Sequence, residues 1–535
     1  MRHALVGAAR LTRLGLRRDR VRLAVWVGAI VLLTVAVAGS FAELYPGEEG
    51  RQQAAATMGS PAALAMTGPA RFLDDYHYGA MMAHQMLAFT AATVAIMSIL
   101  TVIRHTRAEE ESGRAEVVRA SVVGRHAHLA SALLVALVAN LASAAFLAVA
   151  LPPLGVEGIT WEGSALYGLA HLAVGMVFAA VAGIAAQVSE HSRGASGLAF
   201  AVLGLAYVLR AVGDAAGSWL SWASPIGWSQ LTYVYVENRW WVLLPAVALT
   251  AVCVMAGASL SVRRDVGAGL RHPRPGPANA SPALRRPLGF ALRLHRGLIL
   301  GFVAGLGLIG VAYGSIVTEV EEMLGGMDLI GDALAEMGGA TMVDSFASLV
   351  TMVMAILASV YTVMAALRPR TEEASGRAEP VLATGLSAAR WLGSHLIVAA
   401  VASVVVLAAA GLGFGLTALA MTGDDSYVID FLAAAVAYAP ALWLTIGVAA
   451  LLFGLSPRWG VLAWLLPVYG FIVGYLGTLL QFPDWMVNLS PFEHIPGLPV
   501  DPMEWLPIVL LTLAGVGLTV VGMALFRRRD LASTV

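Results

Sequence analysis

The sequence contains no lysine, a single cysteine and few charged residues of either sign. All 33 basic residues among the 535 are arginine, so the lysine that a P-loop places on the nucleotide phosphates is missing. Cys253 alone cannot form an intrachain disulfide or a thiolate metal cluster. The HExxH, CxxC and GxSxG motifs are also absent. We therefore expect no enzyme, and neither cofactor nor metal in this chain.

The composition is that of an integral membrane protein. Charged residues make up 13% and hydrophobic residues 59%, and the mean hydropathy is +0.77, whereas soluble domains average about 25% and about 45–50%. A bilayer core needs about 20 apolar residues per helix. Runs of this kind predict an all-α polytopic protein with about 12 transmembrane helices, near 22–42, 79–103, 127–151, 163–188, 195–213, 240–262, 297–318, 345–367, 391–421, 429–454, 460–480 and 504–526.

A proline- and arginine-rich segment separates the predicted spans into two sets of six. Residues 263–296 contain five prolines and eight arginines, which is typical of a linker. We expect two six-helix transmembrane halves, 1–262 and 297–535, joined by this linker. Residues 4–20 mix leucine with arginine and predict an amphipathic helix in the membrane interface, or an ordinary positive flank. A cleaved signal peptide is the less favoured alternative, because the following apolar run exceeds the usual signal core.

Arginine placement predicts the orientation in the membrane. If both termini are cytoplasmic, 29 arginines and 11 acidic residues lie inside, and four arginines and 23 acidic residues lie outside. Cytoplasmic loops carry the excess of positive charge. The sequence therefore predicts a multi-pass protein of the bacterial inner (plasma) membrane with both termini in the cytoplasm.

A charged stretch occurs twice, once after the second predicted span of each half. Residues 107–116, the first decamer, read RAEEESGRAE, and residues 370–379, the second decamer, read RTEEASGRAE, at an offset of 263. Ser-Pro at 224–225 is repeated at 490–491, and Arg-Arg-Asp at 263–265 is repeated at 528–530. These matches predict that the chain is a duplicated six-helix unit in parallel orientation.

Within each decamer the spacing favours a helix with charged pairs one turn apart. The expected pairs are Glu110 with Arg114 and Glu373 with Arg377, each contributing about 0.2–0.5 kcal/mol. Another face would carry Glu109, Gly113 and Glu116, repeated as Glu372, Gly376 and Glu379, where two carboxylates flank a glycine that allows close approach of a second protein. The alternative is a solvated helix without a partner. The candidate coupling residues are Glu109, Glu110, Glu111, Gly113, Arg114, Glu116, Glu372, Glu373, Gly376, Arg377 and Glu379.

Few ionisable residues lie in the predicted spans, where such groups are costly and often functional. For His84 we favour an ordinary polar contact, and for His171 a hydrogen bond between helices over a proton relay. A metal site at Asp74, Asp75 and His77 is a weak possibility. The GxGxxG at Gly305, Gly307 and Gly310 and the GxxxG pairs Gly301/Gly305 and Gly411/Gly415 favour close helix packing.

The decamers resemble the EE-x-x-G-x-x-E loop of type-2 ABC exporter permeases. The residues after them, 120–125 and 383–387, lack the proline of that family's pattern. Two fused six-helix halves, the repeated Arg-Arg-Asp and the LFGLSPRW at 452–459 are similar to the tetronasin-type antibiotic exporter permeases of actinobacteria, whose drug efflux confers antibiotic resistance. The resemblance extends over the whole chain.

The resemblance implies the partners and the energy source. In that family the loop after the second span docks on a separate ATPase, so the two decamers imply two copies of a cytoplasmic ABC ATPase subunit that hold ATP and Mg. The other expected partners are the lipid bilayer and a hydrophobic small-molecule substrate, with no nucleic acid. A membrane chain without a nucleotide site must receive force through a cytoplasmic surface, which agrees with this implication.

The resemblance also implies a substrate path and a short re-entrant helical pair before the last span of each half. The pair corresponds to 214–239 and 481–503, whose aromatic residues are equally typical of an interfacial belt. The family's path follows the second and fifth spans, and apolar, flexible walls suit variable hydrophobic substrates. Ordinary packing could explain any one of the candidates, which are Phe89, Thr93, Met97, Tyr207, Met352, Trp464 and Tyr469.

Three functions remain open at this point. The favoured one is the permease subunit of an ATP-driven exporter of hydrophobic drug-like or antibiotic molecules. The alternatives are an ion-coupled twelve-span secondary transporter and a membrane scaffold or sensor without transport.

Overall fold

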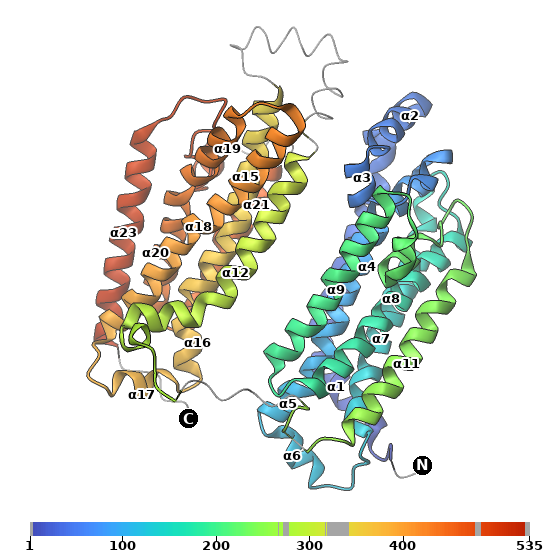
Figure 1. Ribbon diagram of the computed structural model, residues 1–535, viewed down its shortest axis with the longest axis horizontal. Coiled ribbons are helices and arrows are strands. Elements are labelled where there is room, and N and C mark those ends of the chain that lie inside the picture. The colour runs from blue at the N-terminus through green and yellow to red at the C-terminus, as the bar shows by residue number, and fades with distance from the viewer. Residues whose placement is uncertain are drawn as a thin grey trace. The chain divides into compact units, whose positions relative to one another are not determined.

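The computed structural model describes residues 4–265, 267–270, 278–315, 317, 342–476 and 483–529. Every regular element within these residues is helical (Figure 1). The chain divides into two compact units, residues 1–276 and 277–535. Residues 263–270 belong to the first unit, and the first long helix of the second unit already starts at Pro287.

The first unit contains six long helices and several short ones. The short helices α2 and α3 lie at one end, and α5 and α6 lie at the other, which we call the decamer end (Figure 1). The elements are α1 (Ala8–Leu44), α2 (Gly47–Met58), α3 (Pro61–Met66), η1 (Ala70–Asp75), α4 (Tyr78–Arg104), α5 (Arg107–Glu111), α6 (Arg114–Arg119), α7 (Ala127–Ala150), η2 (Pro152–Leu154), α8 (Trp161–Val188), α9 (Ser192–Ala215), η3 (Trp219–Ala223), α10 (Pro225–Gln230), η4 (Trp240–Val242) and α11 (Leu243–Ser261).

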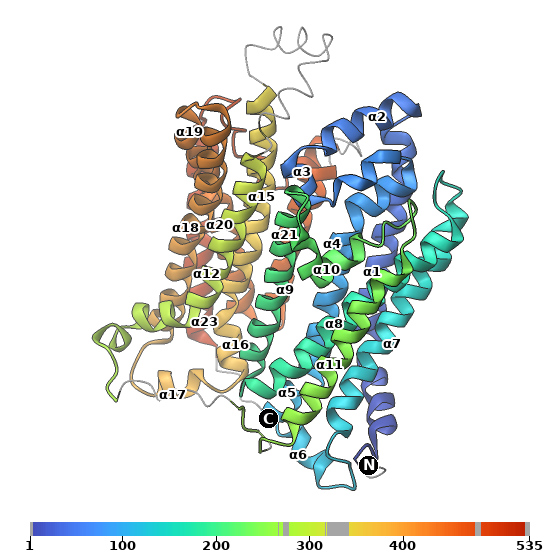
Figure 2. The same cartoon turned by 45° about the vertical axis from the view of Figure 1, so that its right-hand side comes forward.

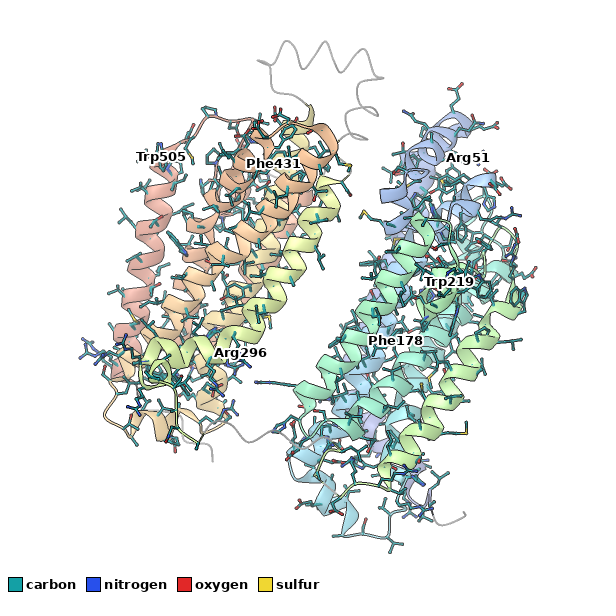
Figure 3. All side chains as sticks on the ribbon, in the orientation of Figure 1. Arg51, Phe178, Trp219, Arg296, Phe431 and Trp505 are labelled. Carbon is teal, nitrogen blue, oxygen red and sulfur yellow. The ribbon has the colours of Figure 1, made fainter. Side chains whose placement is uncertain are left out.

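Helices α4 and α8 form the centre of the first unit. Both are mostly buried, whereas α1, α9 and α11 expose most of their apolar surface, as expected of helices that face lipid. Phe178 of α8 is fully buried and lies among the helices in Figure 3. His171 of α8 bonds through Nε2 to the Thr90 hydroxyl of α4 at 2.7 Å and through Nδ1 to the Tyr167 carbonyl at 2.7 Å. The expected hydrogen bond between helices is confirmed.

The second unit has the same order of long and short helices around its decamer. Figure 2 shows α12, α15, α18 and α20 running along this unit, with α16 and α17 at its decamer end. The elements are η5 (Pro282–Arg285), α12 (Pro287–Gly314), α15 (Met342–Ala366), α16 (Arg368–Ala374), α17 (Ala378–Leu382), α18 (Ala388–Thr422), α19 (Ser426–Ala437), α20 (Ala439–Leu455), η6 (Trp459–Trp464), α21 (Leu465–Leu476), α22 (Asp484–Val487) and α23 (Trp505–Arg528).

Glycines bring the helices of the second unit into close contact. A Cβ on Gly454 of α20 would overlap the carbonyl oxygen of Gly522 on α23, and one on Gly310 of α12 would overlap that of Ala410 on α18. Gly411 and Gly415 similarly face the backbone of α19. The expected close packing is thus confirmed for Gly310, Gly411 and Gly415, whereas Gly301 and Gly305 have open space where a Cβ would lie.

The predicted spans agree with the observed helices. Eleven helices in the described part of the chain are long and apolar enough to cross a membrane, and the shorter apolar stretch Trp459–Gly474 accounts for the remaining predicted span. The all-α polytopic fold with about 12 spans is confirmed. Residues 316, 318 and 477–480, at the ends of two predicted spans, lie outside the described residues.

The N-terminal amphipathic stretch is not a separate helix. From Ala8 it continues without a break into the first span as the 37-residue helix α1. Asp19 is almost fully buried, and its carboxylate accepts hydrogen bonds from Arg104 at 3.1 Å and from His105 at 3.0 Å. These contacts with the end of α4 hold the basic part of α1 against the unit.

Candidate functional site

Each decamer forms two short helices joined at a glycine. In the first unit, α5 ends at Glu111 and α6 begins at Arg114. In the second, α16 ends at Ala374 and α17 begins at Ala378. Gly113 and Gly376 have φ angles of 73° and 70°, a left-handed conformation that interrupts a helix and favours glycine. The prediction of one continuous helix through each decamer was therefore wrong.

The break removes the charged pairs expected one turn apart. Glu110 and Arg114 now lie on different helices, and among the described residues Glu110 pairs with Arg107 and Arg264 instead. Arg377 binds Glu372 rather than Glu373, with Nε 2.7 Å from the carboxylate. This hydrogen bond raises the pKa of the Arg377 guanidinium above its usual value.

In the first unit, Glu110 is the centre of a buried ionic cluster. Arg264 donates from Nη2 to Oε1 at 2.7 Å and from Nη1 to Oε2 at 2.9 Å, and Arg107 donates to Oε2 at 2.8 Å. The side chains of Glu110, Arg107 and Arg264 are 3%, 0% and 6% exposed. Arg107 also donates to the carbonyls of Ala186 and Ala268 at 3.1 and 3.0 Å. The cluster thereby joins α5 to the segment that follows α11.

The second unit contains the corresponding ion pair. Arg529 donates from Nη2 to Glu373 Oε2 at 2.6 Å, and its guanidinium lies over the rings of Phe453 and Phe526 at 4.9 and 5.1 Å. The side chain of Glu373 is 4% exposed and that of Arg529 is 16% exposed. This pair joins α16 to the end of α23.

The two ion pairs connect residues that are repeated in the sequence. Glu110 and Glu373 occupy the same decamer position, and Arg264 and Arg529 are the second arginines of the two Arg-Arg-Asp stretches. In each unit a decamer carboxylate therefore holds the arginine that follows the last long helix. Both repeats are visible in the sequence, but their spacing along the chain does not show that they contact each other. Asp530 lies outside the described residues.

The remaining glutamates on the first side of each break hold neighbouring elements. Glu109 binds Arg18 of α1 at 2.6 Å and faces His128 of α7 at 3.3 Å. Glu111 accepts from the backbone N–H of Ser192 at 2.8 Å, at the start of α9. In the second unit, Glu372 binds Arg368 as well as Arg377. These carboxylates are engaged within their own units.

The residues after each break face outward. Arg114, Glu116, Arg377 and Glu379 are exposed. The expected face shared by Glu109, Gly113 and Glu116 does not form, because Glu109 turns into the unit while Glu116 points out of it. Val117 in α6 and Val122, which follows this helix, are 77% and 91% exposed. Large exposed apolar groups beside charged ones are typical of an interaction surface.

The candidate path residues differ in how they are placed within their units. Phe89 of α4 is 54% exposed, and Thr93 and Tyr207 are half-buried. Met97, in contrast, is fully buried in the core of the first unit, where it serves packing. In the second unit Trp464 is exposed, Met352 is half-buried, and the half-buried Tyr469 donates its hydroxyl to the Met486 carbonyl at 2.6 Å.

The segment before α11 contains a short helical pair. Helices η3 and α10 pack on the end of α9, where a Cβ on Gly227 of α10 would overlap the carbonyl oxygen of Ser221 in η3. In the second unit this region contains α22, and residues 481–482 lie outside the described part.

The polar residues near the start of α4 have local partners. His84 lies 3.0 Å from the Tyr76 hydroxyl and 3.1 Å from the Gly68 carbonyl, which confirms the ordinary polar contact. His77 accepts a hydrogen bond from the backbone N–H of Ala80 at the start of α4, and Asp74 pairs with Arg71 at 3.4 Å. In the described part of the chain no group of three or more potential metal ligands gathers.

The long apolar helices define a polytopic membrane protein, and in each unit a decamer is joined to the end of the last long helix. The chain belongs to the family described as multidrug efflux system permease Rv1217c, C-terminal domain, whose model matches residues 10–260 and 284–527. The multidrug efflux system permease protein Rv1217c of Mycobacterium tuberculosis (strain ATCC 25618 / H37Rv) is 42% identical over 533 residues, covering 98% of this chain and 95% of the relative. The chain is therefore a multi-pass membrane permease, a transport subunit rather than an enzyme.

Proposed function

We propose that the chain is the membrane-spanning permease of an ATP-driven exporter of hydrophobic, drug-like molecules. The relative's name describes a multidrug efflux system, and apolar, flexible residues such as Met352 suit variable substrates. The chain lacks a P-loop, so a separate ATPase subunit supplies the ATP and Mg chemistry. The orientation expected from the arginines places the decamer ends in the cytoplasm, where such a subunit can reach them.

The observation that carries this proposal is the buried link between each decamer and the end of a long helix. Glu110 holds Arg264 after α11, and Glu373 holds Arg529 after α23. A force applied to the exposed helices α6 and α17 would pass to the adjoining helices α5 and α16, which carry these glutamates. Through the two ion pairs it would then reach the last span of each half. A solvated helix without a partner would not require such a connection in both units.

We further propose that one copy of the permease binds two ATPase subunits, one at each decamer. The docking surface consists of the exposed residues after each glycine, Glu116 with Val117 in the first unit and Glu379 in the second. Glu109, Glu110, Glu372 and Glu373 act behind this surface by holding it in place. Closure of the ATPases would draw the two decamers together and switch a path that includes Phe89, Thr93, Tyr207, Met352, Trp464 and Tyr469.

Charge reversal at the exposed positions tests the proposal. The variant Glu116→Lys/Glu379→Lys should lose at least tenfold in affinity for the proposed ATPase subunit, because interfacial charges of the wrong sign are costly. The matched control is Glu43→Lys/Asp425→Lys, which reverses two exposed carboxylates at the opposite ends of the units. Copurification and substrate-stimulated ATP hydrolysis in proteoliposomes are the readouts.

Two results would overturn the proposal. Transport by the permease alone, driven by a pH gradient, would identify a secondary transporter. A complex whose ATP hydrolysis does not respond to any hydrophobic substrate would indicate a scaffold or sensor.

A further inference from the structure

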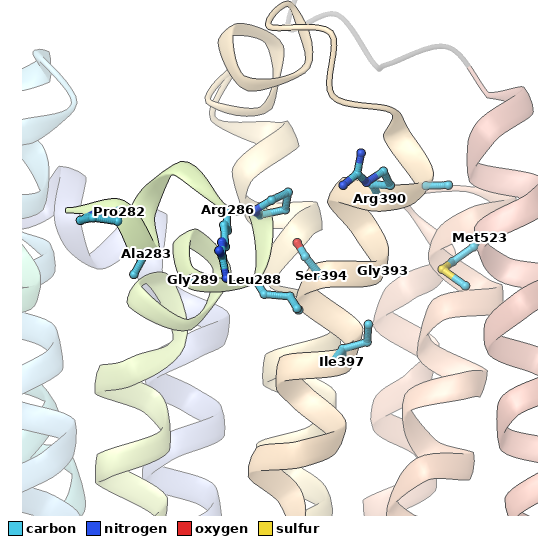
Figure 4. A pocket seen from close by; sticks show the side chains of 12 residues that line it. Pro282, Ala283, Arg286, Leu288, Gly289, Arg390, Gly393, Ser394, Ile397 and Met523 are labelled. Atoms are coloured by element: carbon cyan, nitrogen blue, oxygen red, sulfur yellow. The ribbon is translucent and has the colours of Figure 1, made fainter. Parts of the chain in front are cut away.

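A groove at the decamer end of the second unit has no role in the proposed function. It has a volume of about 1070 Å³ and lies between the start of α12, the first turns of α18 and the last turns of α23 (Figure 4). This volume is at the upper limit of typical small-molecule pockets, about 300–1,000 Å³. The lining residues that matter here are Arg286, Leu288, Arg390, Ile397 and Met523.

The rim of this groove is positively charged. Arg286 precedes α12 and Arg390 lies in the first turn of α18, and both side chains are exposed. Among the described residues neither guanidinium forms an ion pair, and the lining contains no carboxylate. A guanidinium matches a phosphate in shape and charge, so the rim suits a phosphate group.

The walls of the groove are apolar. Leu288 and Ile397 are 48% and 53% exposed, and Met523 of α23 is half-buried. Ile397 lies on the apolar helix α18 and Met523 on α23, both of which qualify as membrane spans. A cationic rim above an apolar wall fits an amphiphile with an anionic headgroup, whereas a free phosphate would use only the rim.

A second groove occupies the corresponding place in the first unit. Its volume is about 710 Å³, and it lies between the residues before α1, the start of α7 and the end of α11. Arg125 contributes its positive charge, Leu133 and Val254 its apolar wall, and its lining also lacks a carboxylate. Ala130 in this groove and Gly393 in the other are separated by the decamer offset of 263. The same construction therefore appears independently in both units.

We propose that each unit binds an anionic phospholipid of the cytoplasmic leaflet in its groove, with the phosphate at the arginines and an acyl chain along the apolar wall. Basic pockets between transmembrane helices on the cytoplasmic side bind such headgroups. The assignment to this leaflet rests on the arginine distribution and not on ATP-driven transport. The groove of the second unit has two arginines where that of the first unit has one, which predicts about fivefold tighter binding in the second unit.

The test uses the full-length chain, purified in neutral detergent and titrated with phosphatidylglycerol or phosphatidylcholine, with bound lipid counted by native mass spectrometry. Wild type should retain phosphatidylglycerol in preference to phosphatidylcholine. Arg286→Gln/Arg390→Gln should lose at least tenfold in phosphatidylglycerol affinity at the groove of the second unit, so that one lipid fewer is retained, and Arg286→Lys/Arg390→Lys should keep part of this affinity. Arg458→Gln, an exposed arginine outside the groove lining, is the control and should bind as wild type does.

A second variant separates a lipid from a free phosphate. Ile397→Ser changes only the apolar wall and should weaken phosphatidylglycerol binding, and glycerol phosphate should not displace the lipid from the wild-type chain. Size-exclusion profiles equal to that of wild type show that the variants are folded. Equal retention of the two lipids, unchanged binding in the glutamine variant, or displacement of lipid by glycerol phosphate alone would overturn the proposal. Occupation of the groove by a transported hydrophobic cation would also overturn the proposal. It would be recognised because the glutamine variant, which lacks the two positive charges, would bind that cation more tightly.

Discussion

Replacing Glu110 by glutamine should destabilise the first unit far more than the same change at a surface glutamate. The substitution keeps the size of the side chain but removes the negative charge that Glu110 shares between two buried arginines. Arg107 and Arg264 have side chains 0% and 6% exposed. Both guanidinium groups would then remain buried without the carboxylate that neutralises them.

The structure sets the size of the effect. Breaking a buried ion pair by removing one partner costs about 3–5 kcal/mol. The lower end applies here, because Arg107 keeps its bonds to backbone carbonyls and Arg264 keeps the 2.7 Å bond from Nε to Gln187 Oε1. A loss of about 3 kcal/mol corresponds to a decrease in Tm of about 6–12 °C for a unit of this size. Arg264→Gln should cost less, because Glu110 would still pair with Arg107.

Thermal unfolding of the full-length chain in detergent, followed by fluorescence-detected size exclusion, measures the difference. Glu116→Gln is the control, because this exposed glutamate in α6 should change the free energy of unfolding by no more than about 0.5 kcal/mol. Equal Tm values for Glu110→Gln and Glu116→Gln would refute the buried cluster as a stabilising link. An Arg264→Gln variant that unfolds at a lower temperature than Glu110→Gln would show that the roles of the partners have been assigned wrongly.

The same assay tests the glycine positions. Gly113→Ala and Gly376→Ala should each cost about 1–2 kcal/mol, because their φ angles of 73° and 70° strain any side chain although nothing obstructs a Cβ there. Gly197→Ala, in open space on α9, is the control and should be neutral or raise the Tm. Equal shifts in Tm for these variants and the control would contradict the role of the left-handed conformation. Gly454→Ala should cost about 1–3 kcal/mol, since its Cβ would overlap the Gly522 carbonyl. Gly517→Ala, where a Cβ meets nothing within 4 Å, is its control, and an equal loss there would argue against close packing of α20 on α23.

The positions of the spans could be predicted from the sequence because apolar length is a local property. Eleven predicted spans coincide with long helices, and the twelfth with the short apolar stretch Trp459–Gly474. The continuity of α1 could not be read in this way. Its basic part looks like an interfacial helix, and only the contact of Asp19 with Arg104 and His105, 85 and 86 residues away, shows how it is held.

The decamer shows why local spacing misled the site prediction. Arg114 lies four positions after Glu110, which favours a pair on a continuous helix, but the left-handed Gly113 ends that helix first. The actual partner, Arg264, is 154 residues away. The sequence does contain a signal for this pair, because the decamer and the Arg-Arg-Asp stretch each occur once in each half. Repeated charges of opposite sign could have been tested as partners before any local pair was assumed.

The glycine and the buried carboxylate have complementary consequences for the proposed coupling. Gly113 lets α6 turn away from α5, so that Glu116 and Val117 are exposed while Glu110 stays inside. Without the break, the docking surface and the link to α11 would have to share one short helix. Without the ion pair, α6 could move independently of α11. The recurrence of both features at Gly376 and Glu373 is what a permease driven at two places would require, since each half must transmit its own displacement.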